Sequence, residues 1–465
     1  MRWSAVFVVA LAAPALAKRP AAAPPPDPAA VGAALLGAAL GGDEAYEELR
    51  ELCDTIGSRI SGSPELDRAI AWGQAEMMAD GLSVTTEPVM VPRWERGPAA
   101  AWVQGEADRP IGLLALGNSV STPPGGLLAP VLVVHSFEEL QARSAEVPGK
   151  IVVYNVPFTT YGETVRFRWD GPNQASKLGA VASLTRSVTP VSLYTPHTGN
   201  QRFAEGTTPI PAAAITIEDA EHLDRLQQRG PAAPYVHLEL RAETKADVPS
   251  ANVVGELRGR ERPDEVVVLG CHLDSWDVGE GAQDDGAGCV TVMQAGALLA
   301  ALPVAPRRTV RVVLFTNEEN GLRGGKGYAE AHAGERIVAA IEDDTGSGAP
   351  LGFGVDGEAW SGAAAGSASI LRERVAWVRP LLASVGADAW TDGGGGADIG
   401  PIVEAGALGI GLEHDMTGYW PIHHTHADTF EKVDPLLVRR NVAAVTLLAY
   451  ALAETADLTP PTPAP

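Results

Sequence analysis

The sequence is poor in cysteine, with three among 465 residues, and poor in cations. Cys53, Cys271 and Cys289 can form at most one bridge, which excludes a disulfide scaffold. Because Cys271 and Cys289 fall in apolar segments, we expect buried free thiols. The 35 Lys and Arg residues stand against 58 Asp and Glu, a formal net charge of −23. This balance argues against nucleic acid as a partner, since phosphate binding needs clustered cations.

Long apolar runs are also scarce. Beyond the first residues, no stretch approaches the roughly 18 uninterrupted apolar residues of a membrane helix. Residues 1–17 have the pattern of an export signal, with Arg2, an apolar run over 5–13 and small residues at 15–17. The Pro/Ala-rich segment 18–30 is expected to be a linker. These features predict a secreted or periplasmic protein with no membrane contact after the signal is removed.

Several catalytic motifs are absent. The sequence contains no His-Glu-x-x-His pair, no Gly-x-Ser-x-Gly elbow and no Gly-x-x-x-x-Gly-Lys-Ser/Thr phosphate loop. The glycine run around Lys326 has the wrong spacing for a phosphate loop. These absences argue against a zinc protease whose ligands lie on one His-Glu-x-x-His helix, against a serine hydrolase with a Gly-x-Ser-x-Gly elbow, and against a nucleotide hydrolase with a phosphate loop.

What is present is an alternation of apolar strands and helices. Helical periodicity fills much of residues 32–82, and beyond residue 251 short apolar strands alternate with helices. This order predicts an α/β fold with a mostly parallel central sheet and helices on both faces. The expected strands and helix cover residues 266–269, 286–302, 309–315, 337–341 and 408–412.

The length favours two domains. Residues 117–245 contain short β-like runs between loops rich in Pro, Gly and Thr, which predicts a strand-rich insert. The main domain is then expected in two parts, residues 31–116 and 246–456, with a Pro/Thr-rich tail over 457–465.

Polar clusters follow four of the predicted strands, where open α/β sheets place their ligand sites. Each alone has an ordinary explanation: Asp-Asp-Gly is typical of a turn, and Glu-Glu of a solvated loop. Acidic turns do not explain why histidines accompany them, since the chain has only ten. The clusters are His272-Leu273-Asp274 with Asp284-Asp285-Gly286, Glu318-Glu319, Glu342-Asp343-Asp344, and His423-His424-Thr425-His426 with Asp428.

Imidazole and carboxylate are the ligands that zinc prefers, and a catalytic zinc keeps one position for water. Two zinc ions that share a carboxylate need about five ligands from several strand ends, and these clusters supply that number. Adjacent Glu318 and Glu319 point in different directions at a strand end. One can bind metal while the other takes a proton from water.

The order of these motifs resembles the co-catalytic zinc aminopeptidase family over residues 45–453. The residues at 272–279 and 423–426 favour its carboxypeptidase Q branch, also called plasma glutamate carboxypeptidase. The resemblance implies a zinc exopeptidase, phosphorylase-hydrolase-like fold, with 117–245 in the place of a protease-associated domain. It also implies a short peptide as the substrate and suggests a homodimer.

Carried over by position, the resemblance implies ligands for two zinc ions, with Asp284 bridging. Glu318 would be the general base, and Asp274 would orient His272. Asp343 stays open as an alternative to Asp344. The implied ligands are His272, Asp284, Glu319, Asp344 and His424.

An exopeptidase must also hold a charged terminus. Asp398 and Asp277 are candidates near a substrate amino group, although either could be structural. The leading hypothesis is therefore a secreted di-zinc exopeptidase acting on dipeptides or terminal residues. Two alternatives stay open: a single-zinc enzyme like the glutaminyl cyclases, and a non-catalytic receptor-like binding protein. The intact set of five ligands argues against the second.

Overall fold

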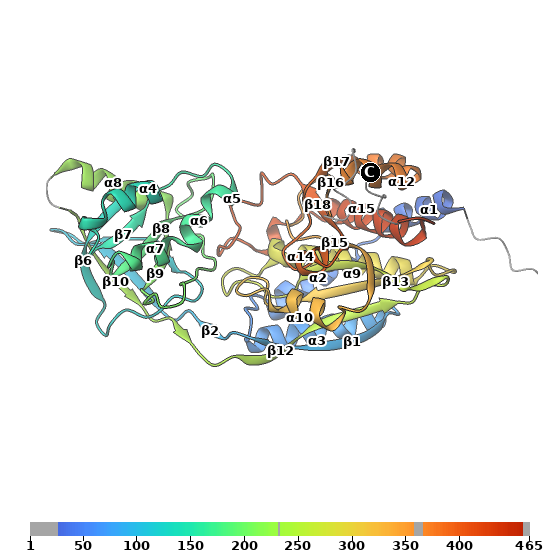
Figure 1. Ribbon diagram of the computed structural model, residues 1–465, viewed down its shortest axis with the longest axis horizontal. Helices are drawn as coiled ribbons and strands as arrows, with labels where there is room; N and C mark the ends of the chain where they lie inside the picture. Colours follow the sequence, from blue (N-terminus) through green and yellow to red (C-terminus); the bar gives the residue numbers. More distant parts are fainter. Residues whose placement is uncertain (1–26, 231–232, 358–365, 459–465) are drawn as a thin grey trace, which may run out of the picture.

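The computed structural model describes residues 27–230, 233–357 and 366–458, which form two lobes, each built on one eight-stranded sheet (Figure 1). The predicted export segment, residues 1–17, lies outside the described residues. The larger lobe contains the predicted strand ends, and the smaller lobe contains the predicted insert.

The sheet of the larger lobe is parallel at its centre and mixed at its edges. Strands β14, β13, β15 and β18 run parallel, whereas β12 and β1 on one side and β16 on the other join in antiparallel fashion. This confirms the predicted α/β fold. The strands, in spatial order, are β1 (Ser83–Val91), β12 (Val248–Leu257), β14 (Arg308–Phe315), β13 (Arg262–His272), β15 (Arg336–Glu342), β18 (Leu408–His414), β16 (Pro350–Asp356) and β17 (Ala389–Asp392).

Helices cover both faces of this sheet because alternate residues of each strand point to opposite sides. Val267 and Leu269 of β13 pack into one apolar cluster with most of the helices, whereas Val266 and Val268 pack into another, with residues near α10 and α14. The helices are α1 (Pro28–Gly41), α2 (Glu44–Glu51), α3 (Pro64–Ala79), α9 (Ala287–Ala300), α10 (Arg323–Ala331), α12 (Ser367–Arg374), α13 (Arg379–Ser384), α14 (Gly400–Glu404) and α15 (Pro435–Glu454).

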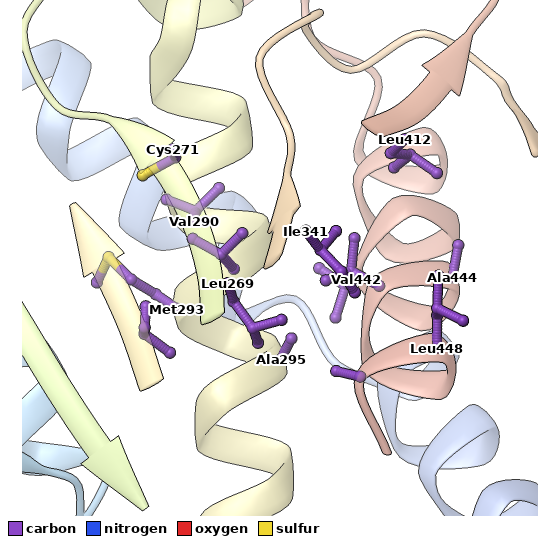
Figure 2. Packing of buried hydrophobic residues seen from close by; sticks show 14 of the residues in the cluster. Leu269, Cys271, Val290, Met293, Ala295, Ile341, Leu412, Val442, Ala444 and Leu448 are labelled. Atoms are coloured by element: carbon purple, nitrogen blue, oxygen red, sulfur yellow. The ribbon is translucent and has the colours of Figure 1, made fainter. Parts of the chain in front are cut away.

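The main core lies between the sheet and helices α9 and α15. Figure 2 shows Val290 and Met293 of α9 beside Leu269 of β13, and Val442 of α15 beside Ile341 of β15. Helix α15 is long and apolar enough to cross a membrane by composition, but 78% of that stretch is buried in the fold. Burial in the core of the larger lobe therefore accounts for the apolar composition of α15.

Helix starts follow local rules. Ser63 caps α3 by accepting a hydrogen bond from the N–H of Leu66, and Asp434 caps α15 by accepting one from Leu436. A proline follows each cap, where its fixed φ suits the first helical position. Helix α1 likewise begins at Pro28 after Asp27. The expected linker 18–30 therefore overlaps this helix by its last three residues.

The smaller lobe surrounds a second sheet whose central strands β6, β7, β8 and β9 are parallel. Its strands, in spatial order, are β4 (Arg109–Pro110), β3 (Ala99–Val103), β10 (Tyr235–Leu240), β6 (Leu127–Val134), β7 (Ile151–Tyr154), β8 (Ala182–Arg186), β9 (Ala212–Ile215) and β5 (Leu113–Ala115). Its helices are α4 (Phe137–Ala142), α5 (Tyr161–Thr164), α6 (Arg166–Trp169), α7 (Gly171–Lys177) and α8 (Ile217–Arg229).

The boundaries of this lobe differ from the predicted 117–245. Strands β3, β4 and β5 precede residue 117 yet pair within the second sheet, so the lobe begins at Ala99. These strands are two to five residues long and carry little periodicity, and only their pairing partners reveal them. A ribbon of β2 (Trp94–Glu95) and β11 (Glu243–Thr244) joins the lobes. At the other end of the chain, buried Leu458 packs in the main core, so the core reaches past the predicted limit at 456.

Candidate metal centre and catalytic site

The polar clusters meet at one edge of the larger sheet. Strand β13 ends at His272, and its parallel neighbours β14 and β15 end just before Glu318 and Asp343. The carboxyl ends of parallel strands lie at the same edge, so these side chains are brought together. Asp284 joins them from a short turn, Ala282–Gly286, just before α9, in which its own φ and ψ are not helical.

Asp284 lies between two imidazoles. Its Oδ1 is 3.3 Å from Nε2 of His272, and its Oδ2 is 3.1 Å from Nε2 of His424. A second carboxylate faces each ring: Oδ1 of Asp344 is 3.1 Å from His272 Nε2, and Oε2 of Glu319 is 3.1 Å from His424 Nε2. The structure therefore brings all five predicted ligands into one cluster with two sides that share Asp284.

This donor set suits a pair of zinc ions. Ligand atoms of His272, Asp284 and Glu319 all lie within 4.8 Å of one another. Oε1 of Glu319 is buried and has no hydrogen-bond partner among the described residues. Buried carboxylate oxygens without a donor are costly, and a divalent cation removes that cost. Two imidazoles and three carboxylates are also the ligand types that zinc takes.

Strong electrostatic coupling marks the cluster. Burial opposes ionisation, but His272 and His424 hold the pKa of Asp284 well below its usual value. Burial likewise disfavours a charged His424, yet Glu319 and Asp284 raise its pKa to about 10. Burial, together with Asp344 and Glu319, raises the pKa of Glu318, although His272 opposes this. An excess of buried negative charge of this kind is what bound cations compensate.

Asp274 acts on His272 through its main chain. Its carbonyl oxygen lies 2.8 Å from Nδ1 of His272, which leaves Nε2 facing the cluster. Its carboxylate instead accepts hydrogen bonds from the main-chain N–H of Glu318 and from Oγ of Ser61. The Asp274 carboxylate therefore supports the segment that carries Glu318, a role that the sequence motif does not reveal.

The three clustered histidines have different environments. His424 faces the cluster, whereas Nε2 of His423 is 3.6 Å from Asp284, and its ring stacks on His424 with 3.6 Å between centroids. His426 is exposed. Because of this geometry, His424 is the best placed of the three to bind an ion beside Glu319.

The two neighbouring aspartates that follow β15, Asp343 and Asp344, also differ. Asp344 faces His272, whereas the buried oxygens of Asp343 have no hydrogen-bond partner in the described part of the chain. Nε2 of His414, on β18, lies 3.8 Å from Asp343, and burial lowers the pKa of His414 to about 4, so this ring is neutral. Alternate residues at a strand end point to opposite sides, which explains why only Asp344 reaches the cluster.

The two candidates for binding a substrate amino group do not lie in the pocket. Both carboxylate oxygens of Asp277 accept hydrogen bonds from Arg96 at 2.5–3.0 Å, so Asp277 joins the two lobes and is not free for substrate. Asp398 is buried, and its pKa is raised well above the usual value by burial and by nearby Glu342 and Glu318. Because Asp398 is buried and is not among the residues that line the pocket, its carboxylate is not placed to contact a substrate.

A pocket of about 540 Å³ opens onto the cluster. The larger lobe contributes Glu318 and the loop over Tyr419 and Trp420, whereas the smaller lobe contributes Tyr161, Arg168 and Asn200. Helices α5 and α6, which carry Tyr161 and Arg168, lie on the side of the smaller lobe nearest the larger one (Figure 1). Sequence reasoning missed this contribution, because these residues form no cluster of ligand types.

Comparisons with known proteins agree with this arrangement. A profile described as peptidase family M28 matches residues 252–449. Carboxypeptidase Q of Mus musculus is 40% identical over 421 residues, which cover 90% of this chain and 87% of that protein. A solved peptidase M28 precursor from Shewanella amazonensis aligns with a TM-score of 0.87 and 32% identity, covering 94% of this chain and 99% of that one.

A zinc aminopeptidase from Bacillus subtilis shares the fold more distantly. Its TM-score is 0.66 at 23% identity, with 89% of this chain and 96% of that one covered. At this identity the likeness shows a shared fold of both lobes.

Proposed function

This chain belongs to peptidase family M28, and from that premise we propose that it is an exported exopeptidase that hydrolyses dipeptides or terminal residues of short peptides with two zinc ions. The observation that carries the proposal is the position of Asp284 between His272 and His424, with Asp344 and Glu319 completing the two sides. A carboxylate so placed can bridge two ions, and each ion then has ligands of its own.

When bound, zinc supplies a Lewis acid that lowers the pKa of a water molecule toward about 7 and polarises the peptide carbonyl. The carboxylate of Glu318 takes the proton of the attacking water and then passes it to the leaving amine. Glu318 suits this role because it lines the pocket beside Glu319 and Asp344, yet it is not one of the side chains that face the two imidazoles. Its main-chain N–H is held by Asp274 at 3.1 Å.

The shape of the pocket supports a short substrate. Its volume of about 540 Å³ is that of a small-molecule site, and residues of both lobes line it. Tyr161, Arg168 and Asn200 of the smaller lobe line the pocket together with Glu318 and Glu319 of the larger lobe. A peptide of one or two residues beyond the scissile bond fits such a space better than a long chain.

Two observations support export. The first 17 residues have the charge, apolar run and small residues of an export signal, although they lie outside the described residues. The Shewanella relative is itself called a precursor. The three cysteines of this chain are buried free thiols, so an exported chain would have its fold stabilised without a disulfide.

A panel of dipeptides, assayed with metal quantified on the same purified protein, tests the proposal. The panel includes each dipeptide free, amino-acetylated and carboxy-amidated, so that the terminus required for turnover is identified. We expect hydrolysis of at least one free dipeptide, two zinc ions per chain, and loss and recovery of activity with chelator and added zinc. One zinc ion per chain with cyclisation of amino-terminal Gln would instead support the glutaminyl-cyclase-like alternative, and ligand binding without turnover would support a receptor.

A further inference from the structure

The main chain of Thr198, in the smaller lobe, contacts the predicted zinc ligand His424 at two points. The N–H of Thr198 donates to the carbonyl oxygen of His424 at 3.0 Å, and the carbonyl oxygen of Thr198 lies 3.1 Å from Nδ1 of His424. One residue of the smaller lobe therefore contacts both the backbone and the ring of a residue that lies 226 positions later.

This contact matters because His424 has an unusual backbone. Its φ is +61°, in the left-handed region that residues other than Gly rarely adopt. The hydrogen bond from the N–H of Thr198 to the carbonyl oxygen of His424 stabilises that backbone conformation. Because Nδ1 faces the Thr198 carbonyl, it is the nitrogen that donates there, and Nε2 is left to offer its lone pair to an ion held with Asp284 and Glu319.

Thr198 is itself held by two arginines of the same half of the chain. Nη1 of Arg168 donates to the Thr198 carbonyl at 3.0 Å and lies 3.2 Å from Nδ1 of His424, so two donors converge on one acceptor. Arg96 donates to Oγ1 of Thr198 at 3.1 Å, and this hydroxyl donates to the carbonyl of Ala115. Thr198 is fully buried, and Arg168 is 5% exposed.

The residue after Thr198 is a glycine, which leaves room for the guanidinium of Arg168. Gly199 has φ +139°, and a Cβ there would lie 2.2 Å from Cζ of Arg168. Nη2 of Arg168 donates to the hydroxyl of Tyr161 at 2.9 Å, and the Tyr161 ring stacks on Trp420 with 4.8 Å between centroids. The contact between the lobes is thus continuous from Thr198 through Arg168 to the loop that carries His424.

We propose that Arg168 and Thr198 are positioning residues for the metal centre, and that the smaller lobe sets the zinc affinity of the side formed by His424, Glu319 and Asp284. On the side formed by His272 and Asp344, the ring of His272 is oriented by the Asp274 carbonyl of the larger lobe. That side does not depend on the contacts of Thr198 and Arg168. This inference rests on the proposed two-zinc function and deepens it. It gives the smaller lobe a role in the centre beyond lining the pocket.

Zinc titration of the metal-stripped full chain against a competing chelating dye tests the proposal. The variants are Arg168→Met, Arg168→Lys and Thr198→Val, with Arg166→Met as the matched control. Arg166 lies on the same helix α6, is exposed, and contacts the rings of Phe137 and Phe167. Circular dichroism of each metal-free protein verifies folding.

The wild type should bind two zinc ions. Arg168→Met should weaken one of the two binding steps about 10-fold or more and leave the other unchanged, in line with the usual effect of residues that orient a metal ligand. Arg168→Lys should recover part of the loss, and Arg166→Met should match the wild type. Thr198→Val should weaken the same step, because it removes the hydroxyl through which Arg96 and Ala115 hold the Thr198 main chain in place. If Arg168→Met fails to fold, Arg168→Lys and Thr198→Val decide the question.

Two unaltered steps in the folded Arg168 or Thr198 variants, or equal weakening of both steps, would overturn the inference. A wild type that binds fewer than two zinc ions would instead contradict the proposed function, so the two failures are distinguishable.

Discussion

Oδ1 of Asp274 accepts a hydrogen bond from the main-chain N–H of Glu318 at 3.1 Å. Its other carboxylate oxygen accepts one from Ser61 at 3.0 Å, and Ser61 in turn accepts one from the side-chain amide of Asn317. A single buried carboxylate therefore fixes the end of β14 from two directions. The general base and the ligand next to it are held in place by a residue that follows a different strand.

Replacing Asp274 with Ala removes this support without removing a predicted ligand. The Glu318 N–H and the Ser61 hydroxyl lose their acceptor, which costs about 1–3 kcal/mol of unfolding free energy for a buried donor left unpaired. We expect kcat to fall more than 10-fold, since small displacements of a catalytic group are costly, while zinc content stays at the wild-type value. Peptidase kinetics and elemental analysis check this. Equal loss of zinc and activity would show that Asp274 acts on the metal ligands and not on Glu318.

Replacing Glu318 with Gln removes the proton acceptor but keeps the size of the side chain. We expect kcat to fall about 10²–10⁴-fold, the usual contribution of a general base, with both zinc ions retained. Glu330→Gln is the matched control, because Glu330 is exposed on α10 and lies outside the residues that line the pocket. Steady-state kinetics with metal analysis measures the effect, and full activity in Glu318→Gln would remove Glu318 from the mechanism.

The metal-binding strand ends could be predicted because two local patterns coincide. Buried parallel strands are continuous apolar runs, and the polar residues that follow them must meet at one edge of the sheet. That reasoning found the clusters at His272, Glu318-Glu319 and Asp343-Asp344, and the family resemblance chose Glu319, Asp344 and His424 within their clusters. Both depend on residues that are close in sequence to a strand end.

The contribution of the smaller lobe could not be predicted in this way. Arg168 lies 256 residues before His424, and Thr198 acts through main-chain atoms that every residue type has. Neither carries a pattern that a sequence motif could record. The same limit applies to Asp277, whose acidic side chain suggested a substrate contact until the structure placed Arg96 against it.

The Arg96–Asp277 pair leads to a separate prediction. Asp277→Asn keeps the shape of the side chain but removes the charge from a contact that is 10% exposed on Arg96 and 24% exposed on Asp277. We expect the free energy of unfolding to fall by about 1–3 kcal/mol, the range for a hydrogen bond to a charged group, with KM for dipeptides unchanged. Chemical denaturation and kinetics test both parts. A large rise in KM with unchanged stability would restore Asp277 as a substrate-binding residue.

The neighbouring histidines provide a paired test of ligand choice. His424→Ala should reduce bound zinc from two ions to one, because Nε2 of His424 is the imidazole nitrogen that faces Glu319 at 3.1 Å. His423→Ala removes the ring stacked on His424 and should retain both ions with weaker binding on that side. Elemental analysis after dialysis at fixed free zinc measures the difference. The reverse pattern would make His423 the ligand.

An acidic cluster outside the pocket of the metal centre should make stability depend on pH. Glu48 on α2 lies among other carboxylates, and burial first, then Asp80 and Glu76, raise its pKa from 4.5 to about 8. Its folded pKa therefore exceeds its unfolded pKa. The stability that protonated Glu48 contributes is complete below pH 4.5 and is lost as pH rises through about 8.

Glu48→Gln should accordingly stabilise the protein at pH 8 and change nothing at pH 4.5, where the wild-type side chain is already protonated. We expect a gain of about 1–3 kcal/mol at pH 8, below the full linkage value of about 1.4 kcal/mol per pKa unit because Glu48 is partly solvated. Thermal unfolding at both pH values, with chelator present so that zinc release does not contribute, measures it. Glu330→Gln serves as the exposed control. A pH-independent gain would show that packing and not charge limits stability at Glu48.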